Sequence, residues 1–198
     1  MSCAQTAISK TAKEPLLQLR AQPLRIALVG NPNVGKSVLF GRLTGQYAIV
    51  SNYPGTTVAV TKGRALVGAE VCDLIDTPGV NALEGELSED ELVTRRIVAG
   101  GDVDVVIQVA DARNLRRGLM LTSQLAACGK PLVLALNMID EARSHGIDVD
   151  SAALGRRLGV PVIETVATEG RGVAALREAL EAGHAILSVY ANDPDLLK

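Results

Sequence analysis

The sequence contains few aromatic residues and no tryptophan. Among 198 residues there are three tyrosines and one phenylalanine, so aromatics make up 2% of a chain that is 47% hydrophobic. A core must therefore be built from leucine, valine, isoleucine and alanine, which is typical of the buried strands of a parallel sheet. The length is sufficient for one domain with a sizeable core.

Cysteine and histidine are equally scarce. Cys3, Cys72 and Cys128 show no paired short spacing, which argues against a zinc site or a disulfide framework and fits a reducing compartment. His145 and His184 have no partners at metal-ligand spacing, and we expect them at helix ends or on the surface.

The chain also lacks a basic surplus and a long apolar run. Its formal net charge of −2 gives no reason to expect a nucleic-acid partner, because such binding depends on clustered positive charge. The longest apolar runs, around "DVVIQVA" and "PLVLALNMI", fall well short of the roughly 20 residues of a membrane helix. The first residues lack the apolar segment of a secretory signal, so the chain as given is expected to be soluble.

Strand and helix patterns alternate after residue 23, which predicts a doubly wound α/β fold. We expect a mostly parallel six-stranded sheet with one antiparallel edge strand and helices on both faces. Residues 1–23 are predicted to be a flexible extension, 24–188 one domain, and 189–198 a tail. The predicted strands are 24–30, 57–66, 70–76, 103–111, 131–137 and 160–165, and the predicted helices are 35–45, 88–100, 115–129, about 150–158, and 172–187.

The stretch "GNPNVGKS" fits the phosphate-loop pattern G-x-x-x-x-G-K-[ST] between a predicted strand and a predicted helix. Backbone N–H groups of such a loop point at a phosphate, and the helix N-terminus favours negative charge. Lys36 is expected to reach the β- and γ-phosphates and the Ser37 hydroxyl to bind Mg²⁺. The predicted nucleotide-binding residues here are Gly30, Asn31, Pro32, Asn33, Val34, Gly35, Lys36, Ser37 and Val38.

Two further segments are placed to respond to a terminal phosphate. "DTPG" follows the third predicted strand, where Asp76 can hold a water on Mg²⁺ and the Gly79 N–H can bond the γ-phosphate, with Thr77 and Pro78 beside them. Within "YPGTTV", a threonine can close over Mg²⁺ in the triphosphate state and swing away after hydrolysis. Thr57 is our choice, with Thr56 as the alternative, and we expect Tyr53 and residues 46–57 to form the moving element.

"NMID" at the end of a strand predicts a guanine site. Asp140 can accept hydrogen bonds from guanine N1–H and the exocyclic amine, which adenine does not offer in that arrangement. Asn137 can donate to N7 and tie its loop to the phosphate loop, and Met138 lies between them. Backbone groups of "TVAT", namely Val166, Ala167 and Thr168, are expected against guanine O6.

The sequence resembles the N-terminal G domain of the ferrous iron transport protein B (FeoB) family, a Ras-like P-loop GTPase domain. The resemblance covers about residues 24–180 and rests on "GNPNVGKSVLFGRLTG", "NYPGTTV", "DVVIQVADARNLRRGLMLTSQL", "LALNMIDEARSHGI" and "RLGVPVIETVATEGRGVAAL". The methionine of "NMID" and the stretch "DARNLRRGLMLTSQL" are its most specific features. The chain departs from the family in reading "DTPG" for Asp-Leu-Pro-Gly and "VAVTK" where the family continues its switch threonine with Val-Glu-Arg-Lys.

The resemblance implies GTP hydrolysis with Asn33, Lys36, Thr57 and Gly79 in catalytic roles. Many such enzymes carry a glutamine after the glycine, but Val80 stands here. The resemblance then implies that K⁺, held by Asn33 and backbone carbonyls of the first switch, supplies the missing positive charge. We expect slow hydrolysis that K⁺ accelerates much more than Na⁺ does, although Asn33 as a loop-shaping residue stays an alternative.

Family members continue into a small helical domain and a polytopic membrane domain that passes Fe²⁺. The resemblance therefore implies a nucleotide switch for ferrous iron uptake at the cytoplasmic face of the bacterial inner membrane. Its partners would be GTP and GDP, that membrane domain of the same polypeptide, and small accessory iron-transport proteins. Two alternatives stay open: an RNA- or ribosome-associated assembly GTPase, and a nucleotide-sensing module in which hydrolysis is incidental.

Overall fold

The computed structural model describes residues 23–45 and 48–183. Almost all of the predicted extension 1–23, the whole tail 189–198 and the end of the predicted helix 172–187 lie outside the described residues, as do positions 46 and 47 of the predicted moving element. In the described part of the chain no helix is long and apolar enough to cross a membrane.

A seven-stranded mixed sheet forms the centre of the described chain, with the order β2-β3-β4-β1-β5-β6-β7. Strands β4, β1, β5, β6 and β7 run parallel to one another, whereas β3 is antiparallel to both of its neighbours. The strands are β1 (Arg25–Gly30), β2 (Ala48–Asn52), β3 (Ala59–Val67), β4 (Glu70–Asp76), β5 (Val105–Asp111), β6 (Leu132–Asn137) and β7 (Val162–Glu164).

The predicted fold class is confirmed, but the strand count differs by one. Strand β2 occupies part of the segment that the sequence pattern assigned to a moving loop, so it replaces β3 as the edge of the sheet. Its apolar residues Ile49 and Val50 are 73% and 67% exposed. Backbone pairing with β3 therefore defines this strand, and there is no buried face to produce an alternating pattern.

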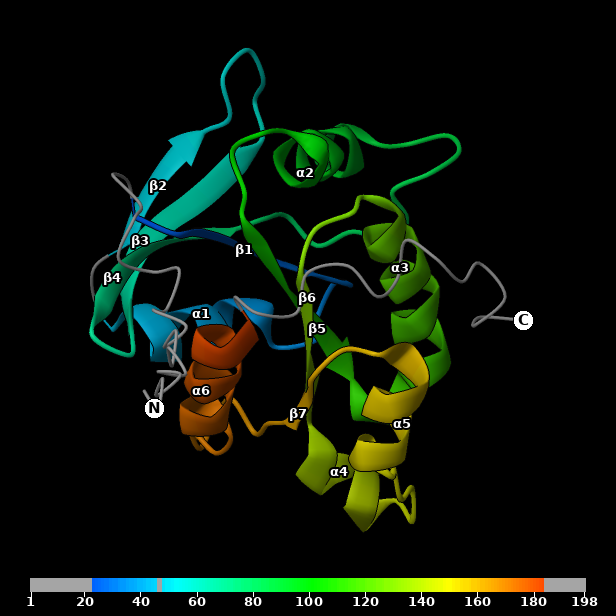
Figure 1. Ribbon diagram of the computed structural model, residues 1–198. Coiled ribbons are helices and arrows are strands. Elements are labelled where there is room, and N and C mark those ends of the chain that lie inside the picture. Colours follow the sequence, from blue (N-terminus) through cyan, green and yellow to red (C-terminus); the bar gives the residue numbers. More distant parts are fainter. Residues whose placement is uncertain (1–22, 46–47, 184–198) are drawn as a thin grey trace, which may run out of the picture.

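Helices cover both faces of the sheet (Figure 1). Helices α1 and α6 pack with one cluster of buried aliphatic side chains, and α2, α3, α4 and α5 contribute to the other. Ser88 and Glu91 form the capping box of α2, as the acidic start of that predicted helix favours. The helices are α1 (Lys36–Thr44), α2 (Glu89–Ala99), α3 (Leu115–Ala127), α4 (Ile139–Ser144), α5 (Ser151–Leu158) and α6 (Val173–Gly183), with a short 3₁₀ turn η2 (Ala112–Asn114) before α3.

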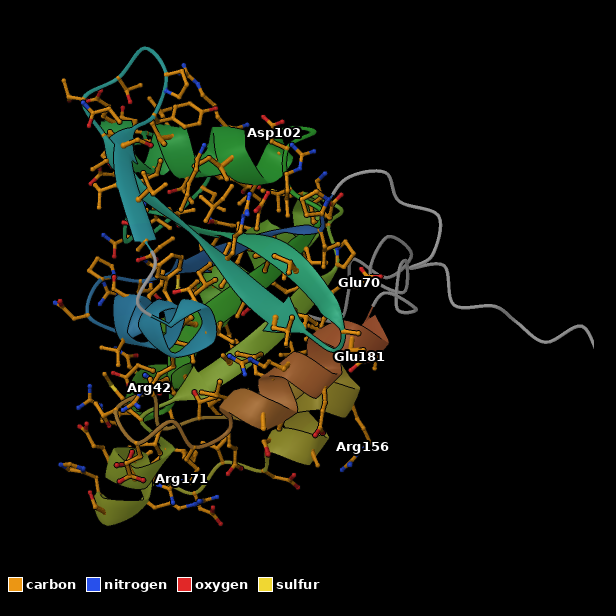
Figure 2. All side chains as sticks on the ribbon, turned by 90° about the vertical axis from the view of Figure 1, so that its left-hand side faces the viewer. Arg42, Glu70, Asp102, Arg156, Arg171 and Glu181 are labelled. Carbon is orange, nitrogen blue, oxygen red and sulfur yellow. The ribbon has the colours of Figure 1, made fainter. Side chains whose placement is uncertain are left out.

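The parallel arrangement brings the predicted motifs to one edge of the sheet. Strands β1, β4, β5, β6 and β7 all end there, and each is followed by a loop or a short helix that carries polar residues. This carboxyl edge is where ligands bind in open α/β sheets. Away from this carboxyl edge, Glu181 of α6 lies beside Gly68, in the turn that joins β3 to β4 (Figure 2).

Candidate nucleotide-binding site

The loop between β1 and α1 has a backbone path that two glycines make possible. Gly35, immediately before α1, has φ 84°, and a Cβ there would lie 2.3 Å from Nδ2 of Asn137. Gly30 is needed for a different reason, because its Cβ would lie 2.4 Å from the carbonyl oxygen of Val109 on β5. Asn33 between them is exposed and also left-handed, with φ 64°. The loop thus leads directly into the N-terminus of α1, where backbone N–H groups favour a bound anion.

Lys36 and Ser37 converge on Asp76 at the end of β4. The Lys36 Nζ donates to Asp76 Oδ1 at 2.5 Å and to the carbonyl oxygen of Thr77, while the Ser37 Oγ donates to Asp76 Oδ2 at 2.8 Å. Lys36 and Asp76 are each 8% exposed. A hydroxyl and a carboxylate side by side are hard oxygen donors of the kind Mg²⁺ prefers, so these residues fit the ion.

Asn137, at the end of β6, connects the three loops of the site. Its Nδ2 donates to the carbonyl oxygen of Val34 at 2.9 Å, and its Oδ1 accepts from the Ala167 N–H at 3.0 Å and from the Thr165 hydroxyl at 3.2 Å. The residue is 3% exposed. The predicted tie between base loop and phosphate loop is therefore present, and it extends to "TVAT".

Asp140 and Met138 lie beside this tie. The Oδ1 atom of Asp140 is buried and has no hydrogen-bond partner within residues 23–45 and 48–183. Met138 is left-handed, with φ 60°, and its Cε reaches toward the phosphate loop, 3.8 Å from where a Cβ on Gly35 would be. A buried carboxylate oxygen without a donor is costly, and a ligand that supplies a donor would remove that cost.

Other predicted residues are placed less directly. Gly79 lies against Pro32 of the phosphate loop, where a Cβ would come 3.0 Å from the Pro32 Cα. Thr57 instead faces α2, with its N–H and hydroxyl 3.5 Å and 3.4 Å from the carboxylate of Glu89. Thr56 is turned to its own loop and donates to the Tyr53 carbonyl at 2.9 Å. The loop between β2 and β3 lies beside α2 and apart from α1 in both views (Figures 1 and 2), and the two threonine hydroxyls donate to Tyr53 and Glu89 and not to Ser37.

Val80 is the position where a catalytic glutamine is absent. Its side chain is 0% exposed and belongs to the core cluster on the α2 and α3 face. Its backbone binds the phosphate loop, because the Val80 N–H donates to Gly30 O at 3.0 Å and its carbonyl accepts from Asn31 Nδ2 at 2.9 Å.

The sequence analysis did not identify Arg42 as part of this site. From α1 it donates to the carbonyl oxygens of Ala167, at 3.1 Å, and of Thr168. In Figure 2 it lies between α1 and the loop that carries Arg171. A single arginine in the last turn of a helix has the same sequence signature as a solvated charge, so no pattern could have separated the two.

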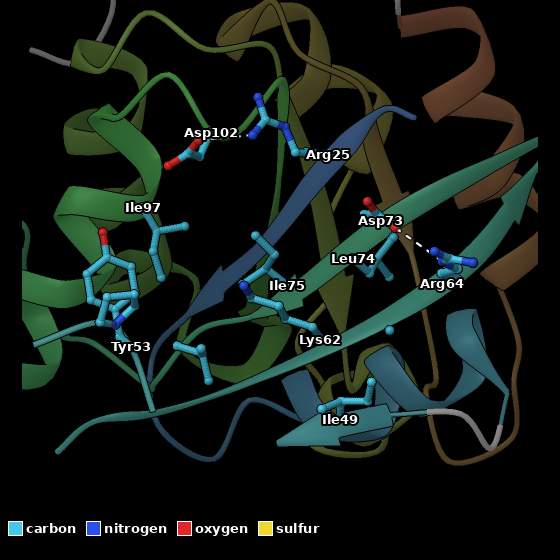
Figure 3. A pocket seen from close by; sticks show the side chains of 13 residues that line it. Arg25, Ile49, Tyr53, Lys62, Arg64, Asp73, Leu74, Ile75, Ile97 and Asp102 are labelled. Atoms are coloured by element: carbon cyan, nitrogen blue, oxygen red, sulfur yellow. Dashed lines mark hydrogen bonds and ion pairs between the residues drawn. The ribbon is translucent and has the colours of Figure 1, made fainter. Parts of the chain in front are cut away.

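A hollow of about 490 Å³ lies elsewhere, between β2, β3, β4 and the end of α2. Figure 3 shows Arg25 paired with Asp102 and Arg64 paired with Asp73 at its rim. None of the predicted nucleotide-binding residues lines it.

The order of strands, the phosphate loop and the base loop together define a Ras-like P-loop GTPase domain. The chain belongs to the ferrous iron transport protein B family, whose N-terminal model matches residues 24–180. The Fe(2+) transporter FeoB of Salmonella typhimurium and that of Escherichia coli are each 42% identical to it over 161 residues, which is 80% of this chain and 21% of each relative. The chain thus spans about a fifth of the length of these curated relatives.

Solved structures agree with this assignment. The cytosolic domain of Legionella pneumophila FeoB is 41% identical, with a TM-score of 0.76, over 80% of this chain and 68% of that one. The G domain of Thermotoga maritima FeoB is 37% identical, with a TM-score of 0.77, over 82% of this chain and 99% of that one. The T. maritima cytosolic domain in its GMPPNP form is 38% identical, with a TM-score of 0.78, over 83% and 65% respectively.

Proposed function

We propose that the chain binds GTP and hydrolyses it to GDP and phosphate, as the nucleotide switch that regulates ferrous iron uptake across the bacterial inner membrane. The observation that carries the nucleotide part is the buried Oδ1 of Asp140, which has no hydrogen-bond partner among the described residues and belongs to the segment that Asn137 ties to the phosphate loop. Guanine supplies two adjacent donors, N1–H and the exocyclic amine, which match a carboxylate. Adenine has no such pair, so it would leave the buried oxygen unsatisfied.

The phosphates are proposed to lie over the start of α1. Lys36 is already directed to this point by Asp76 and Thr77, and a bound triphosphate would compete for its ammonium group. Ser37 and Asp76 would hold Mg²⁺, Ser37 directly and Asp76 through water, and the ion would neutralise the phosphate charge. Thr57 would have to leave Glu89 to join them, which is the rearrangement proposed for residues 46–57.

The charge that develops during hydrolysis is proposed to be neutralised by K⁺ near Asn33. Three features support this: the exposed, left-handed Asn33, the buried side chain of Val80, and the resemblance of "GNPNVGKS" to the family loop. The attacking water would be held by backbone groups and Thr57, since Val80 has no polar side-chain atom.

Base selectivity provides the first test. Wild type should bind mant-GDP much more tightly than mant-ADP, and Asp140→Asn should lose mant-GDP binding. The same variant should gain affinity for xanthosine diphosphate, because xanthine carries a carbonyl where guanine carries its amine and an amide can donate to it. A discrimination of about tenfold or more is expected from one correctly paired site. Equal affinities of wild type for the guanine and adenine nucleotides would refute the assignment.

Hydrolysis in matched KCl and NaCl provides the second test. K⁺ should accelerate wild type and should have much less effect on Asn33→Ala, while Asn114→Ala, at an exposed asparagine of η2, serves as the matched control. If both salts support the same rate and Asn33→Ala leaves it unchanged, the cation mechanism is wrong and Asn33 only shapes the loop.

The transport role rests on the relatives, which are Fe(2+) transporters about five times as long as the match. In this proposal the domain acts at the cytoplasmic face, with a membrane domain of the same polypeptide and with small accessory iron-transport proteins. Radiolabelled Fe²⁺ uptake by cells that produce the full-length protein with Lys36→Ala should fall to the level of cells without it. Undiminished uptake would show that transport does not depend on nucleotide turnover and would contradict this role.

A further inference from the structure

Arg113 occupies a place next to the base loop that no nucleotide motif assigns. It follows β5 in the turn η2, and Asp111 at the end of β5 is paired in register with Asn137 at the end of β6. The turn η2 and helix α4, which carries Asp140, are therefore neighbours at the carboxyl edge of the sheet.

The guanidinium group of Arg113 contacts three residues at once. Its Nε lies 2.9 Å and 3.2 Å from the two carboxylate oxygens of Asp111, and its Nη2 lies 2.8 Å from Asp111 Oδ2. The same Nη2 is 3.1 Å from the Sδ of Met138, and Nη1 forms an ion pair with Glu141. One planar fork thus joins the end of β5 to both ends of the segment 138–141.

Asp111 fixes the orientation of the Arg113 guanidinium group. The Asp111 carboxylate also accepts from the Arg113 backbone N–H at 2.8 Å, so side chain and turn are held together. Burial opposes ionisation of Asp111, but the hydrogen bonds and charge of Arg113 outweigh it and lower the pKa of this carboxyl. The Asp111 carboxylate in turn raises the pKa of Arg113 above its usual value. Both groups are therefore charged throughout the neutral range.

The contacts of Arg113 with Met138 and Glu141 lie on either side of Asp140, the residue proposed to bind the base. Met138 precedes Asp140 by two positions and Glu141 follows it directly. Met138 is left-handed, a conformation that costs a non-glycine residue free energy and needs support from its surroundings. Met138 itself carries no charge, so the charged side chains at this segment are those of Asp140, Glu141 and Arg113.

We propose that Arg113 is a positioning residue for guanine recognition: by holding Met138 and Glu141 it sets the orientation of the Asp140 carboxylate. The inference rests on the proposed function, since it concerns how the same site distinguishes its base. Arg113 does not touch the base in this scheme. It acts through Asp140, and its effect is therefore greatest for the ligand that uses both carboxylate oxygens.

Inosine nucleotides make this distinction measurable. Hypoxanthine keeps N1–H but lacks the exocyclic amine, so inosine diphosphate forms one of the two contacts with Asp140. For Arg113→Ala, the affinity for mant-GDP should fall about fivefold, through faster dissociation, while that for mant-IDP falls much less. The ratio of the two affinities should therefore drop toward one. The rate at saturating GTP should stay near wild type, because the side-chain contacts of Arg113 go to Asp111, Met138 and Glu141 and not to Lys36 or Ser37.

Two further variants separate positioning from a general loss of structure. Arg113→Lys keeps the charge but lacks the fork, so it should recover only part of the GDP to IDP ratio. Glu141→Gln removes the charge from one of the two outer contacts and leaves the turn η2 unchanged in sequence, and it should lower the ratio in the same direction. Urea denaturation of the ligand-free proteins measures the cost to stability, and Arg157→Ala, in the last turn of α5, provides a matched control at an exposed arginine.

The outcomes are distinct. A reduced GDP to IDP ratio in Arg113→Ala and Glu141→Gln supports the inference. An unchanged ratio overturns it, whether both affinities stay constant or both fall equally, because a purely structural role would affect the two ligands alike. Failure of the wild type to prefer mant-GDP to mant-ADP would instead overturn the proposed function itself.

Discussion

Replacing Asn137 with alanine should destabilise the ligand-free protein severely, because the residue ties the base loop to the phosphate loop in the absence of any nucleotide. Asn137 is 3% exposed, and its side-chain amide makes three hydrogen bonds, to Val34, Thr165 and Ala167. Removal leaves a buried carbonyl and a buried N–H without partners, and each costs about 1–3 kcal/mol. We therefore expect a loss of about 3 kcal/mol, which lowers the Tm by about 6–12 °C for a domain of this size.

Urea denaturation followed by circular dichroism measures this loss without any nucleotide. Asn31→Ala is the matched control, because Asn31 is also 3% exposed but, among the described residues, makes a single side-chain hydrogen bond, to Val80. It should cost about 1 kcal/mol. If Asn137→Ala is no more destabilising than Asn31→Ala, the bridge does not hold the loops together and the reasoning is refuted.

Three further predictions concern Gly35 in the phosphate loop, Cys72 in β4 and Glu91 in α2. Gly35→Ala should lower both stability and mant-GDP affinity, because its Cβ would lie 2.3 Å from Asn137 Nδ2 and the backbone has φ 84°; wild-type binding would contradict this. Burial raises the pKa of the Cys72 thiol to about 11, so its reaction with a disulfide reagent at pH 8 should be on the order of a hundredfold slower in the folded protein than after unfolding. Hydrogen bonds from Ser88 lower the pKa of Glu91, so Glu91→Gln should destabilise at pH 7 and progressively less as the pH falls below 4.5; a constant difference in urea denaturation at pH 7 and pH 3 would show that the charge of Glu91 is irrelevant.

The sequence predicted the parallel part of the fold well because its strands are buried on both faces. Runs such as "DVVIQVA" and "PLVLALN" carry their own signal in composition, and each falls on an observed strand. Strand β2 was missed since all five of its residues are exposed, and a strand held by backbone pairing alone leaves no pattern in its side chains. Helix α4 was missed because six residues are too short to show helical periodicity.

For the site, too, local features could be predicted from the sequence and contacts between distant segments could not. The placement of Gly35 and Lys36 at the start of α1 was predictable, because the loop and the helix that follows it are contiguous in sequence. The contacts of Arg42 with residue 167 and of Arg113 with residue 141 join segments far apart in the chain. Their arginines have no spacing that marks them, so the folded sheet is needed to show which loops meet.

Val80 stands where many GTPases carry a glutamine, and its surroundings show what that difference means. The position is occupied by a side chain in a fully buried aliphatic cluster, and its backbone N–H and carbonyl are both bonded to the phosphate loop. A glutamine there would have to bury an amide among aliphatic groups, at a cost of about 1–3 kcal/mol, or break the contacts with Gly30 and Asn31. The position thus fastens the segment after β4 to the phosphate loop, and its side chain offers no polar atom that could hold a water. In the proposed mechanism the compensating positive charge comes from the exposed side of the phosphate loop at Asn33, because the Val80 position is filled by a buried aliphatic side chain.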